Sequence, residues 1–170
     1  IAQLVNTTLR QLTVGMDASN VVGVWDCIYK MQLASHGMGA ACAIAMSGLD
    51  MALWDIRGKA IGWPLYKLLG GSNVGIRAYA GGVSLGYQPV DELIEEAGTV
   101  VHAGYNALKL RIGDTWALDA ERVEGVRDAL GDEVDILTDA NTAYTVHDVR
   151  RVMPVLDECA VGWLEEPFAP

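Results

Sequence analysis

Two stretches of the sequence decide the fold, VDILTDAN at residues 134–141 and VGWLEEP at residues 161–167. Each begins with a short apolar run that predicts a β-strand, and each run leads into an acidic residue, Asp139 in the first and Glu165 in the second. One helix-length segment separates the runs, so both carboxylates are expected at the carboxyl ends of successive parallel strands. In a β/α barrel that end of the strands carries the active site. Carboxylate oxygens are the ligands that Mg²⁺ prefers, and the two stretches therefore predict a divalent-metal site.

Strands and helices alternate from residue 76 to the end of the sequence. The expected strands cover residues 76–84, 107–112, 134–138 and 161–164, and the expected helices cover residues 90–103, 116–130 and 145–159. This alternation implies βαβ crossovers and a parallel sheet, hence an α/β fold. Four strands make half of an eight-stranded TIM-type barrel, and half a barrel would leave open sheet edges. Residues 76–170 are therefore predicted to be the first half of a modified barrel, strands 1–4, with the remainder beyond this sequence.

Residues 1–75 are predicted to form a separate helical domain. The segment DASN at residues 17–20 is expected to cap a helix, and a longer helix is expected over residues 40–57, where Gly58 ends it. That longer helix is apolar nearly all round, which predicts that it is buried. Because the sequence begins without a methionine and stops directly after a strand-end motif, we expect it to be an internal portion of a longer enzyme.

The composition argues against several kinds of partner. The formal net charge is −10, and no cluster of Lys and Arg is present to neutralise a run of phosphates, so no nucleic-acid partner is expected. No uncharged run reaches the roughly 18 residues of a membrane helix, so no membrane partner is expected either. The three cysteines, Cys27, Cys42 and Cys159, are widely spaced and lack histidines at ligand spacing. They predict unpaired thiols in a reducing compartment, for which a cytoplasmic location is the default.

The second expected strand ends in the cationic motif Lys109-Leu110-Arg111. Strand periodicity places Lys109 and Arg111 on the same side of the strand, with Leu110 opposite. Two cations that point into a barrel are unfavourable unless they face anions, and a metal-bound carboxylate substrate would provide such an anion. The alternative is that one of them reaches solvent or pairs with Asp139 or Glu165.

Other polar residues are expected to contribute less. Glu166 follows Glu165 directly, and adjacent residues of an extended segment face opposite ways, so Glu166 is not expected to bind the metal. The segment GGVSLG at residues 81–86 lacks the lysine and the spacing of a phosphate loop, and we expect it to pack in the first strand under the active site. The three histidines are expected at the surface; they are His36, His102 and His147.

A family resemblance becomes specific over residues 45–167. The segment AMSGLDMALWDIRGK at residues 45–59, followed by PL at 64–65 and LLG at 68–70, closely resembles the N-terminal signature of the mandelate racemase and muconate lactonizing branch of the enolase superfamily. The Lys-x-Arg, Asp-Ala-Asn and Glu-Glu-Pro motifs then occur in the order that this branch has on its second, third and fourth barrel strands. The resemblance implies an α+β capping domain, whose helical part matches the first domain, closing a modified barrel.

The same resemblance implies roles for individual residues. Asp139 and Glu165 are similar to the first two of three Mg²⁺ ligands, and the third is expected beyond Pro170. Asn141 matches a position that often contacts substrate. The implied chemistry is removal of the proton α to a carboxylate, with the metal and the cations stabilising the enediolate.

Arg111 departs from the pattern of the branch, which often has Lys-x-Lys with the second lysine as a base. Arginine stays protonated, so it is a poor base and a good carboxylate clamp. A histidine on a late strand, outside this sequence, is then the expected base, as in the acid-sugar dehydratases of the branch.

The leading hypothesis is therefore a Mg²⁺-dependent lyase that dehydrates a sugar acid, in which Lys109 and Arg111 hold the substrate carboxylate. The alternatives are a racemase, epimerase or cycloisomerase of the same branch and, from a different class, a non-catalytic barrel. The expected partners are a small carboxylate substrate and further copies of the chain in a homo-oligomer.

Overall fold

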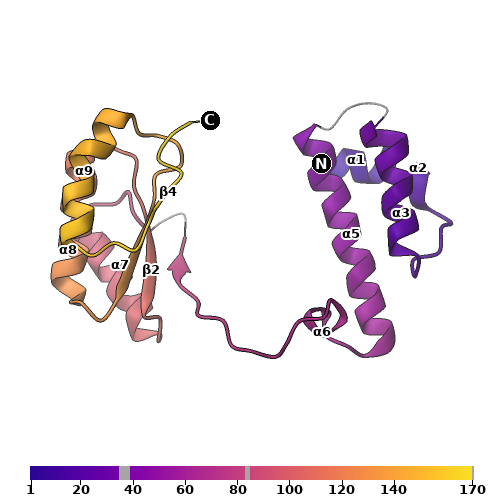
Figure 1. The fold of residues 1–170 in the computed structure, drawn as a ribbon, viewed down its shortest axis with the longest axis horizontal. Coiled ribbons are helices and arrows are strands. Elements are labelled where there is room, and N and C mark those ends of the chain that lie inside the picture. The colour runs from indigo at the N-terminus through magenta and orange to yellow at the C-terminus, as the bar shows by residue number, and fades with distance from the viewer. Residues whose placement is uncertain (35–38, 83–84, 170) are drawn as a thin grey trace. The chain divides into compact units, whose positions relative to one another are not determined.

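The computed structural model describes residues 1–34, 39–82 and 85–169. The chain divides into two compact units, Ile1–Gly75 and Ile76–Pro170 (Figure 1). Every element assigned in the first unit is a helix, whereas the second unit alternates strands with helices. The helices of the first unit are α1 (Ala2–Leu4), η1 (Val5–Leu9), α2 (Arg10–Thr13), α3 (Val21–Ile28), η2 (Tyr29–Leu33), α5 (Ala40–Ile61) and α6 (Leu65–Leu68).

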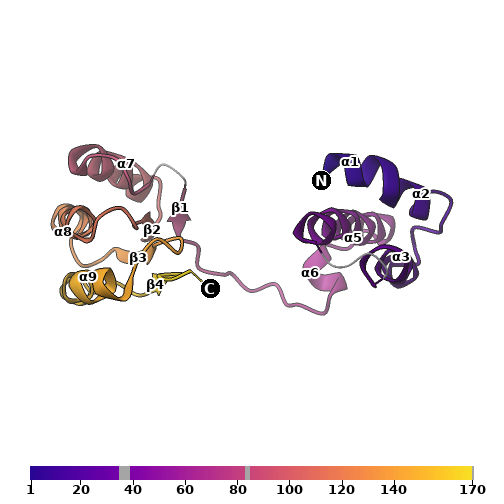
Figure 2. The same cartoon turned by 90° about the horizontal axis from the view of Figure 1, so that it is seen from above.

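The core of the first unit forms where α1, η1 and α3 contact the long helix α5 (Figure 2). The predicted cap segment begins α3, because the side-chain oxygen of Asn20 accepts a hydrogen bond of 3.1 Å from the backbone N–H of Gly23. The buried side chains of this core come from η1, α3 and α5: Leu9, Val21, Val24, Ile28, Cys42, Ala45, Met46 and Leu53.

The prediction that Gly58 ends the long helix is wrong, since α5 continues to Ile61. The helix ends at Gly62, whose φ of 68° is in the left-handed region that glycine adopts without strain. The N–H groups of Gly62 and Trp63 donate to the carbonyl oxygens of Lys59 and Gly58, at 3.3 and 2.9 Å, which is a Schellman arrangement. Gly58 is instead a buried residue of the helix, where glycine leaves room for the Trp63 carbonyl oxygen, since a Cβ there would lie 2.8 Å from it.

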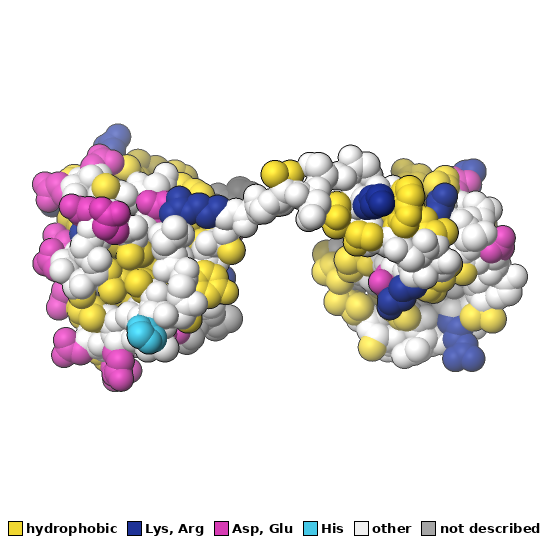
Figure 3. Space-filling view, turned by 90° about the horizontal axis from the view of Figure 1, so that it is seen from below, with side chains coloured by type: hydrophobic (Ala, Val, Ile, Leu, Met, Phe, Trp, Pro, Cys, Tyr) yellow, Lys and Arg dark blue, Asp and Glu magenta, His cyan; other side chains and the backbone are white. Residues whose placement is uncertain are grey.

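The prediction that the long helix is buried is wrong for much of its surface. Ile44, Met51 and Ile56 on α5 are 53%, 62% and 50% exposed, because the first unit covers only one side of the helix. Figure 3 shows hydrophobic side chains on the surface of this unit, whereas acidic side chains are frequent on the surface of the second. Among the helices of the described residues, none combines the length and the apolar character that a membrane crossing requires.

The second unit is a parallel sheet of four strands in the order β1-β2-β3-β4. Its three helices form one layer against one face of the sheet (Figure 2). The predicted α/β alternation is confirmed. The elements are β1 (Ala80–Gly81), α7 (Val90–His102), β2 (Ala107–Arg111), α8 (Trp116–Leu130), β3 (Asp135–Asp139), α9 (Val146–Glu158) and β4 (Leu164–Glu165).

The core of the second unit lies between the sheet and its helices. Apolar side chains that alternate along β2 and β3 point into this layer and meet the inner faces of α7, α8 and α9. Burying them removes apolar surface from water, which is the main favourable contribution to folding. The fully buried members include Leu93, Leu108, Leu110, Ile112, Val123, Val126, Ile136 and Val152.

The first strand is much shorter than predicted. Residues 76–84 were expected to form it, but among the described residues of this range only Ala80 and Gly81 pair with β2, opposite Leu108 and Lys109. Ile76 has no strand partner among the described residues and is 92% exposed. An alternating pattern indicates a strand, but backbone pairing decides its length. Residues 83 and 84 of the expected strand lie outside the described part of the chain.

A capping box at the start of α9 gives a stability prediction. The Thr145 hydroxyl accepts a hydrogen bond from the Asp148 backbone N–H at 3.3 Å, and the Asp148 carboxylate accepts one from the Thr145 N–H at 2.9 Å. Thr145→Ala is expected to lower the free energy of unfolding by about 0.5–2 kcal/mol, measured by urea denaturation of the complete polypeptide. Thr145→Ser keeps the accepting oxygen and serves as the control. Equal stability of the alanine and serine variants would contradict the assigned cap.

Candidate active site

The carboxyl ends of β2, β3 and β4 bring the predicted polar residues together. Arg111 is paired in register with Asp139, and Asp139 with Glu165, so these three residues occupy one row across the sheet. Lys109 lies on the same side of β2, since it is two residues before Arg111. The buried Leu110 faces the helices instead. The strand-end placement expected from the sequence is therefore what the structure has.

The Lys109 ammonium lies between the two carboxylates. Its Nζ is 3.0 Å from Asp139 Oδ2 and 3.0 Å from Glu165 Oε2. The side chains of Lys109 and Asp139 are 11% and 4% exposed, so this contact is largely shielded from water. The hydrogen bond to Asp139, supported by Glu165, holds the pKa of Lys109 above its usual value although burial acts in the opposite direction. Lys109 is therefore a cation at neutral pH.

Arg111 occupies the more exposed side of the same cluster. Its Nη1 donates to Asp139 Oδ2 at 2.9 Å and to Asn141 Oδ1 at 2.6 Å, and its side chain is 26% exposed. Both cations thus pair with acidic side chains in this structure, which is the alternative that the sequence left open. The guanidinium has five N–H donors, so these two contacts leave further donors for another anion.

Asp139 is the centre of the cluster. Its burial alone would raise its pKa, but the hydrogen bonds from Lys109 and the Asn141 backbone, together with the charges of Lys109 and Arg111, hold that pKa below its usual value. Asn141 adopts a left-handed conformation, with φ of 43°, which asparagine tolerates better than most residues. In this conformation its backbone N–H and its side-chain amide both donate to Asp139 Oδ1, at 3.0 and 2.9 Å.

The chemistry of this cluster fits a magnesium ion in part. Asp139 and Glu165 already direct one carboxylate oxygen each toward a single cation, the Lys109 ammonium. Hard oxygen donors of this kind are those that Mg²⁺ selects, and the ion usually keeps water or substrate oxygens at its other positions. Within residues 1–34, 39–82 and 85–169, no group of three or more His, Cys, Asp or Glu residues could hold a metal. The described residues therefore offer two carboxylates at this position, Asp139 and Glu165.

Among the described residues, the weaker candidates add no side-chain hydrogen bond or ion pair to this cluster. Glu166 is exposed, and with φ of 43° its backbone turns so that its carbonyl accepts a hydrogen bond from Thr142. His102 and His147 are exposed on α7 and α9, as predicted, and His36 is outside the described residues. In the glycine-rich segment, the buried Leu85 accepts a hydrogen bond of 2.8 Å from the Arg111 N–H, so this part of the segment packs beside β2.

A buried polar group on α8 was not expected from the sequence. Asp119 and Arg122 are 0% and 8% exposed, and the Asp119 carboxylate accepts a hydrogen bond of 2.6 Å from the hydroxyl of the buried Tyr144. The spacing of charged residues in the sequence does indicate this buried group. Asp119 and Arg122 are three residues apart, and they fall on the same helix face as the buried Val123 and Val126. Charged residues on an apolar face are unfavourable unless they find partners.

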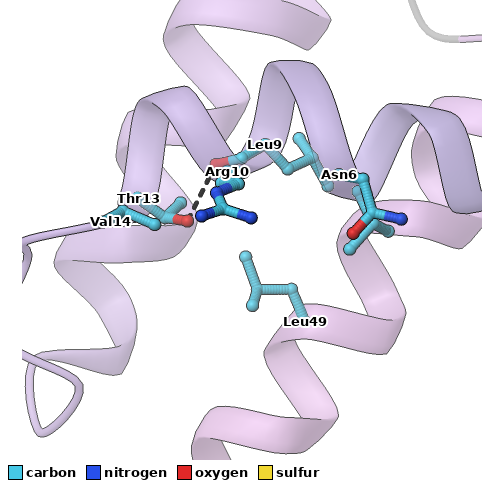
Figure 4. Close-up of a pocket in the computed structure, with 7 residues that line it drawn as sticks. Asn6, Leu9, Arg10, Thr13, Val14 and Leu49 are labelled. Atoms are coloured by element: carbon cyan, nitrogen blue, oxygen red, sulfur yellow. Dashed lines mark hydrogen bonds between the residues drawn. The ribbon is translucent and has the colours of Figure 1, made fainter.

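A hollow in the first unit is a poor candidate for the active site. It has a volume of about 280 Å³, and its lining includes Arg10 as the one charged residue (Figure 4). The hydrogen bond drawn there joins the Thr13 hydroxyl to the Leu9 carbonyl within the helical segment. Without a carboxylate or a second ionisable group in its lining, the hollow offers no acid, base or metal ligand. The lining residues are Val5, Asn6, Leu9, Arg10, Thr13, Val14 and Leu49.

A parallel β/α sheet with carboxylates and cations at the carboxyl ends of its strands defines the class of barrel enzymes that use this end as the active face. The chain belongs to the enolase superfamily, in its mandelate racemase and muconate lactonizing branch. Residues 1–70 match the model of the mandelate racemase / muconate lactonizing enzyme N-terminal domain, and residues 92–170 match that of the enolase C-terminal domain-like family. The predicted resemblance and the predicted barrel-type fold class are confirmed.

Three relatives illustrate the match. A 3,6-anhydro-alpha-L-galactonate cycloisomerase of Streptomyces coelicolor is 33% identical over 171 residues, which cover 100% of this chain and 47% of that protein. The structure of an enolase superfamily member from Polaromonas sp. JS666 is 61% identical, with a TM-score of 0.90, over 98% of this chain and 44% of that one. The structure of L-talarate dehydratase from Polaromonas sp. JS666, complexed with Mg and L-glucarate, is 30% identical, with a TM-score of 0.83, over 97% of this chain and 47% of that one. The chain spans about half the length of these relatives.

Proposed function

We propose that the chain supplies part of the active site of a Mg²⁺-dependent lyase that removes the proton α to the carboxylate of a sugar acid and expels water. The observation that carries the proposal is the convergence of Lys109, Arg111, Asp139 and Glu165 at the carboxyl ends of adjacent parallel strands. Two anions and two cations in this position suit a substrate that carries negative charge and develops more of it in the reaction.

Each residue of the cluster has a proposed role. Asp139 and Glu165 hold Mg²⁺, with a third protein ligand from outside residues 1–170. When bound, the ion supplies Lewis-acid stabilisation of the substrate carboxylate. Lys109 and Arg111 donate hydrogen bonds to the same carboxylate and neutralise its charge. Asn141, which already positions both Asp139 and Arg111, contacts the substrate.

The relatives supply both the leading proposal and its alternative. The L-talarate dehydratase holds magnesium and L-glucarate, a sugar acid, which supports a small carboxylate substrate for this chain. The cycloisomerase relative supports an isomerase or cycloisomerase as the second candidate. We favour the dehydratase because an arginine at position 111 is unsuited to act as the second base that racemisation needs. The abstracting base is then a histidine from outside these residues.

The remaining proposals concern the first unit, the oligomeric state and the cellular location. The first unit is proposed to be the helical part of a capping domain. A homo-oligomer and a cytoplasmic location remain predictions; the three cysteines are unpaired, which is compatible with a reducing compartment.

Isotope exchange tests the proposal directly. The complete polypeptide is incubated with Mg²⁺ and a set of sugar acids in D₂O, and substrate and product are analysed by NMR and mass spectrometry. A one-base dehydratase is expected to give dehydrated product and no deuterium-labelled epimer of the substrate. Deuterium in both stereoisomers of the substrate would show that the enzyme is a two-base isomerase and not a dehydratase. Absence of Mg²⁺-dependent turnover with every acid, in a folded preparation, would refute both candidates.

Arg111 provides a second test of the proposed clamp. Arg111→Lys keeps the positive charge but loses the two-pronged donor geometry. We expect it to lose about 1–3 kcal/mol of transition-state stabilisation, which corresponds to a fall in kcat/KM of roughly 5- to 150-fold. Arg111→Met removes the charge as well and is expected to lose more. Arg77→Lys is the matched control, since Arg77 is exposed and pairs with Asp135 at the opposite end of the strands. A lysine variant with no loss, beside an equally active methionine variant, would exclude Arg111 from substrate binding.

A further inference from the structure

A buried carboxylate on α8, that of Asp119, forms hydrogen bonds with the loops that follow β2 and β3, next to the candidate site. Asp119 is fully buried, and its Oδ2 accepts hydrogen bonds from the N–H groups of Gly113 and Asp114 at 2.9 and 3.0 Å and from the Tyr144 hydroxyl at 2.6 Å. Its Oδ1 accepts a hydrogen bond of 3.1 Å from Arg122 Nη1. Both carboxylate oxygens are therefore satisfied by groups from three parts of the chain. We call these residues the Asp119 network.

Arg122 extends the network to a third loop. Its Nε and Nη2 donate to the backbone carbonyls of Gln88 and Tyr87, at 3.2 and 2.9 Å, and its Nη1 and Nη2 lie 3.2 and 3.3 Å from the Asp114 carboxylate. The loops that precede α7, follow β2 and follow β3 thus all join the first turns of α8. Tyr87 adds a hydrogen bond of 2.9 Å from its hydroxyl to the Ile112 carbonyl.

The three loops are those next to Arg111 and Asn141. Gly113 is two residues after Arg111, and Tyr144 is three residues after Asn141. The Arg111 N–H also donates to the carbonyl of Leu85, just before the loop that Arg122 holds. Among the described residues, the hydrogen bonds of the network end on none of Lys109, Asp139 and Glu165. The network therefore contacts the loops that flank Arg111 and Asn141, and not the side chains of the cluster itself.

Stability alone is a weak explanation for this network. A buried ion pair must overcome the loss of hydration of both partners, and well-packed apolar residues often replace such pairs with no loss of stability. Satisfied polar networks do rigidify the groups they join. Here the joined groups belong to the loops that directly follow Arg111 and Asn141, whose side chains hydrogen-bond to each other at 2.6 Å.

We propose that Asp119 is a positioning residue: through Tyr144 and Arg122 it fixes the loops after β2 and β3 and so sets the substrate-carboxylate side of the site, Arg111 and Asn141. The metal side, Asp139 and Glu165, is held by strand pairing, and none of the hydrogen bonds that define the network in the described residues ends on its carboxylates. This inference rests on the proposed function.

Tyr144→Phe is the sharpest test, because it removes one hydroxyl donor to Asp119 and little else. For the complete polypeptide, kcat/KM with a sugar acid is expected to fall about 10- to 100-fold, mainly through a higher KM, since small displacements of positioning groups have effects of this size. Mg²⁺ affinity measured by calorimetry is expected to stay within about twofold of wild type, because the network does not touch the carboxylates that we propose as ligands. Tyr105→Phe, at an exposed tyrosine, is the matched control and should change neither quantity.

Two further variants keep the test decisive. Asp119→Asn puts an amide N–H₂ against groups that are themselves donors, so it should show a larger loss of kcat/KM with Mg²⁺ affinity again retained. If it or Tyr144→Phe does not fold, Tyr87→Phe, which loses only the bond to Ile112, is measured in the same way and should shift KM in the same direction. Unchanged kinetics in a less stable Tyr144→Phe, or a parallel loss of Mg²⁺ affinity, would show a merely structural network. A wild type without Mg²⁺-dependent turnover would instead refute the proposed function, so the two failures are distinguishable.

Discussion

Asp139→Asn is expected to abolish Mg²⁺ binding and turnover in the complete polypeptide. The carboxylate is held ionised by Lys109 and Arg111, and the amide that replaces it has the same shape without the charge that a hard cation requires. Loss of a hydrogen-bonding partner behind a metal ligand already weakens metal affinity about 10- to 100-fold, and loss of the ligand itself should exceed that. Calorimetric titration with Mg²⁺ and turnover of a sugar acid are the measurements.

The control for this prediction is Asp135→Asn on the same strand. Asp135 begins β3, on the side of the strand that Asp139 shares, and it is 52% exposed in a salt bridge with Arg77. Exposed pairs of this kind contribute about 0–1 kcal/mol, so metal binding and turnover should be unchanged. Both variants are expected to keep the far-ultraviolet circular dichroism of the wild type. Normal Mg²⁺ titration in a folded Asp139→Asn variant would remove Asp139 from the proposed metal site.

Gly86→Ala is expected to have the largest effect on folding. Gly86 has φ of 152°, and a Cβ at this position would lie 2.2 Å from the carbonyl oxygen and 2.6 Å from the backbone nitrogen of Arg111. Because the obstacle is the backbone of β2 rather than a flexible side chain, the loop or the strand must move. Overpacking of a core costs about 1–3 kcal/mol and occasionally more, and the unfavourable φ adds to it. We expect a loss of about 3 kcal/mol or more of unfolding free energy, or failure to accumulate folded protein.

Gly98→Ala is the matched control for this second prediction. Gly98 is in α7, and a Cβ there meets nothing within 4 Å. Alanine is preferred over glycine in a helix by about 0.5–1 kcal/mol, so this variant should be as stable as the wild type or more stable. Urea denaturation of both variants checks the pair. Equal stability of Gly86→Ala and wild type would mean that the loop does not approach β2 as closely as the structure has it.

Local patterns in the sequence were sufficient for most of the second unit. The predicted helix 116–130 matches α8, and the predicted helix 145–159 matches α9 together with its two caps. These boundaries are set by residues near them in the chain, such as the Thr145 cap, and periodicity identifies what lies between. Strand periodicity also placed Lys109 and Arg111 on one side of β2.

Other features could not be predicted from the sequence because residues far apart in the chain determine them. The length of β1 depends on how much of it finds hydrogen-bonding partners in β2. The end of α5 depends on which of two glycines, four residues apart, adopts the left-handed conformation. Gly62 adopts it and ends the helix, whereas Gly58 remains helical and packs closely against the Trp63 carbonyl. The exposure of α5 depends on how much of its surface other helices cover. None of these quantities is encoded in the local pattern of residues.

The sequence by itself determined that acidic residues end two successive parallel strands and that two cations share one side of the strand before them. It also carried the motifs of the enolase superfamily. Tertiary structure alone decided the register that sets Arg111 beside Asp139 and Asp139 beside Glu165, and with it the ion pairs of the cluster. It alone joined Asp119 and Arg122 to three loops, in one of which Tyr87 is 35 residues from Arg122 along the chain. The physical reason is that hydrogen bonds and charges act over a few ångströms in space, whereas sequence patterns report only on neighbours along the backbone.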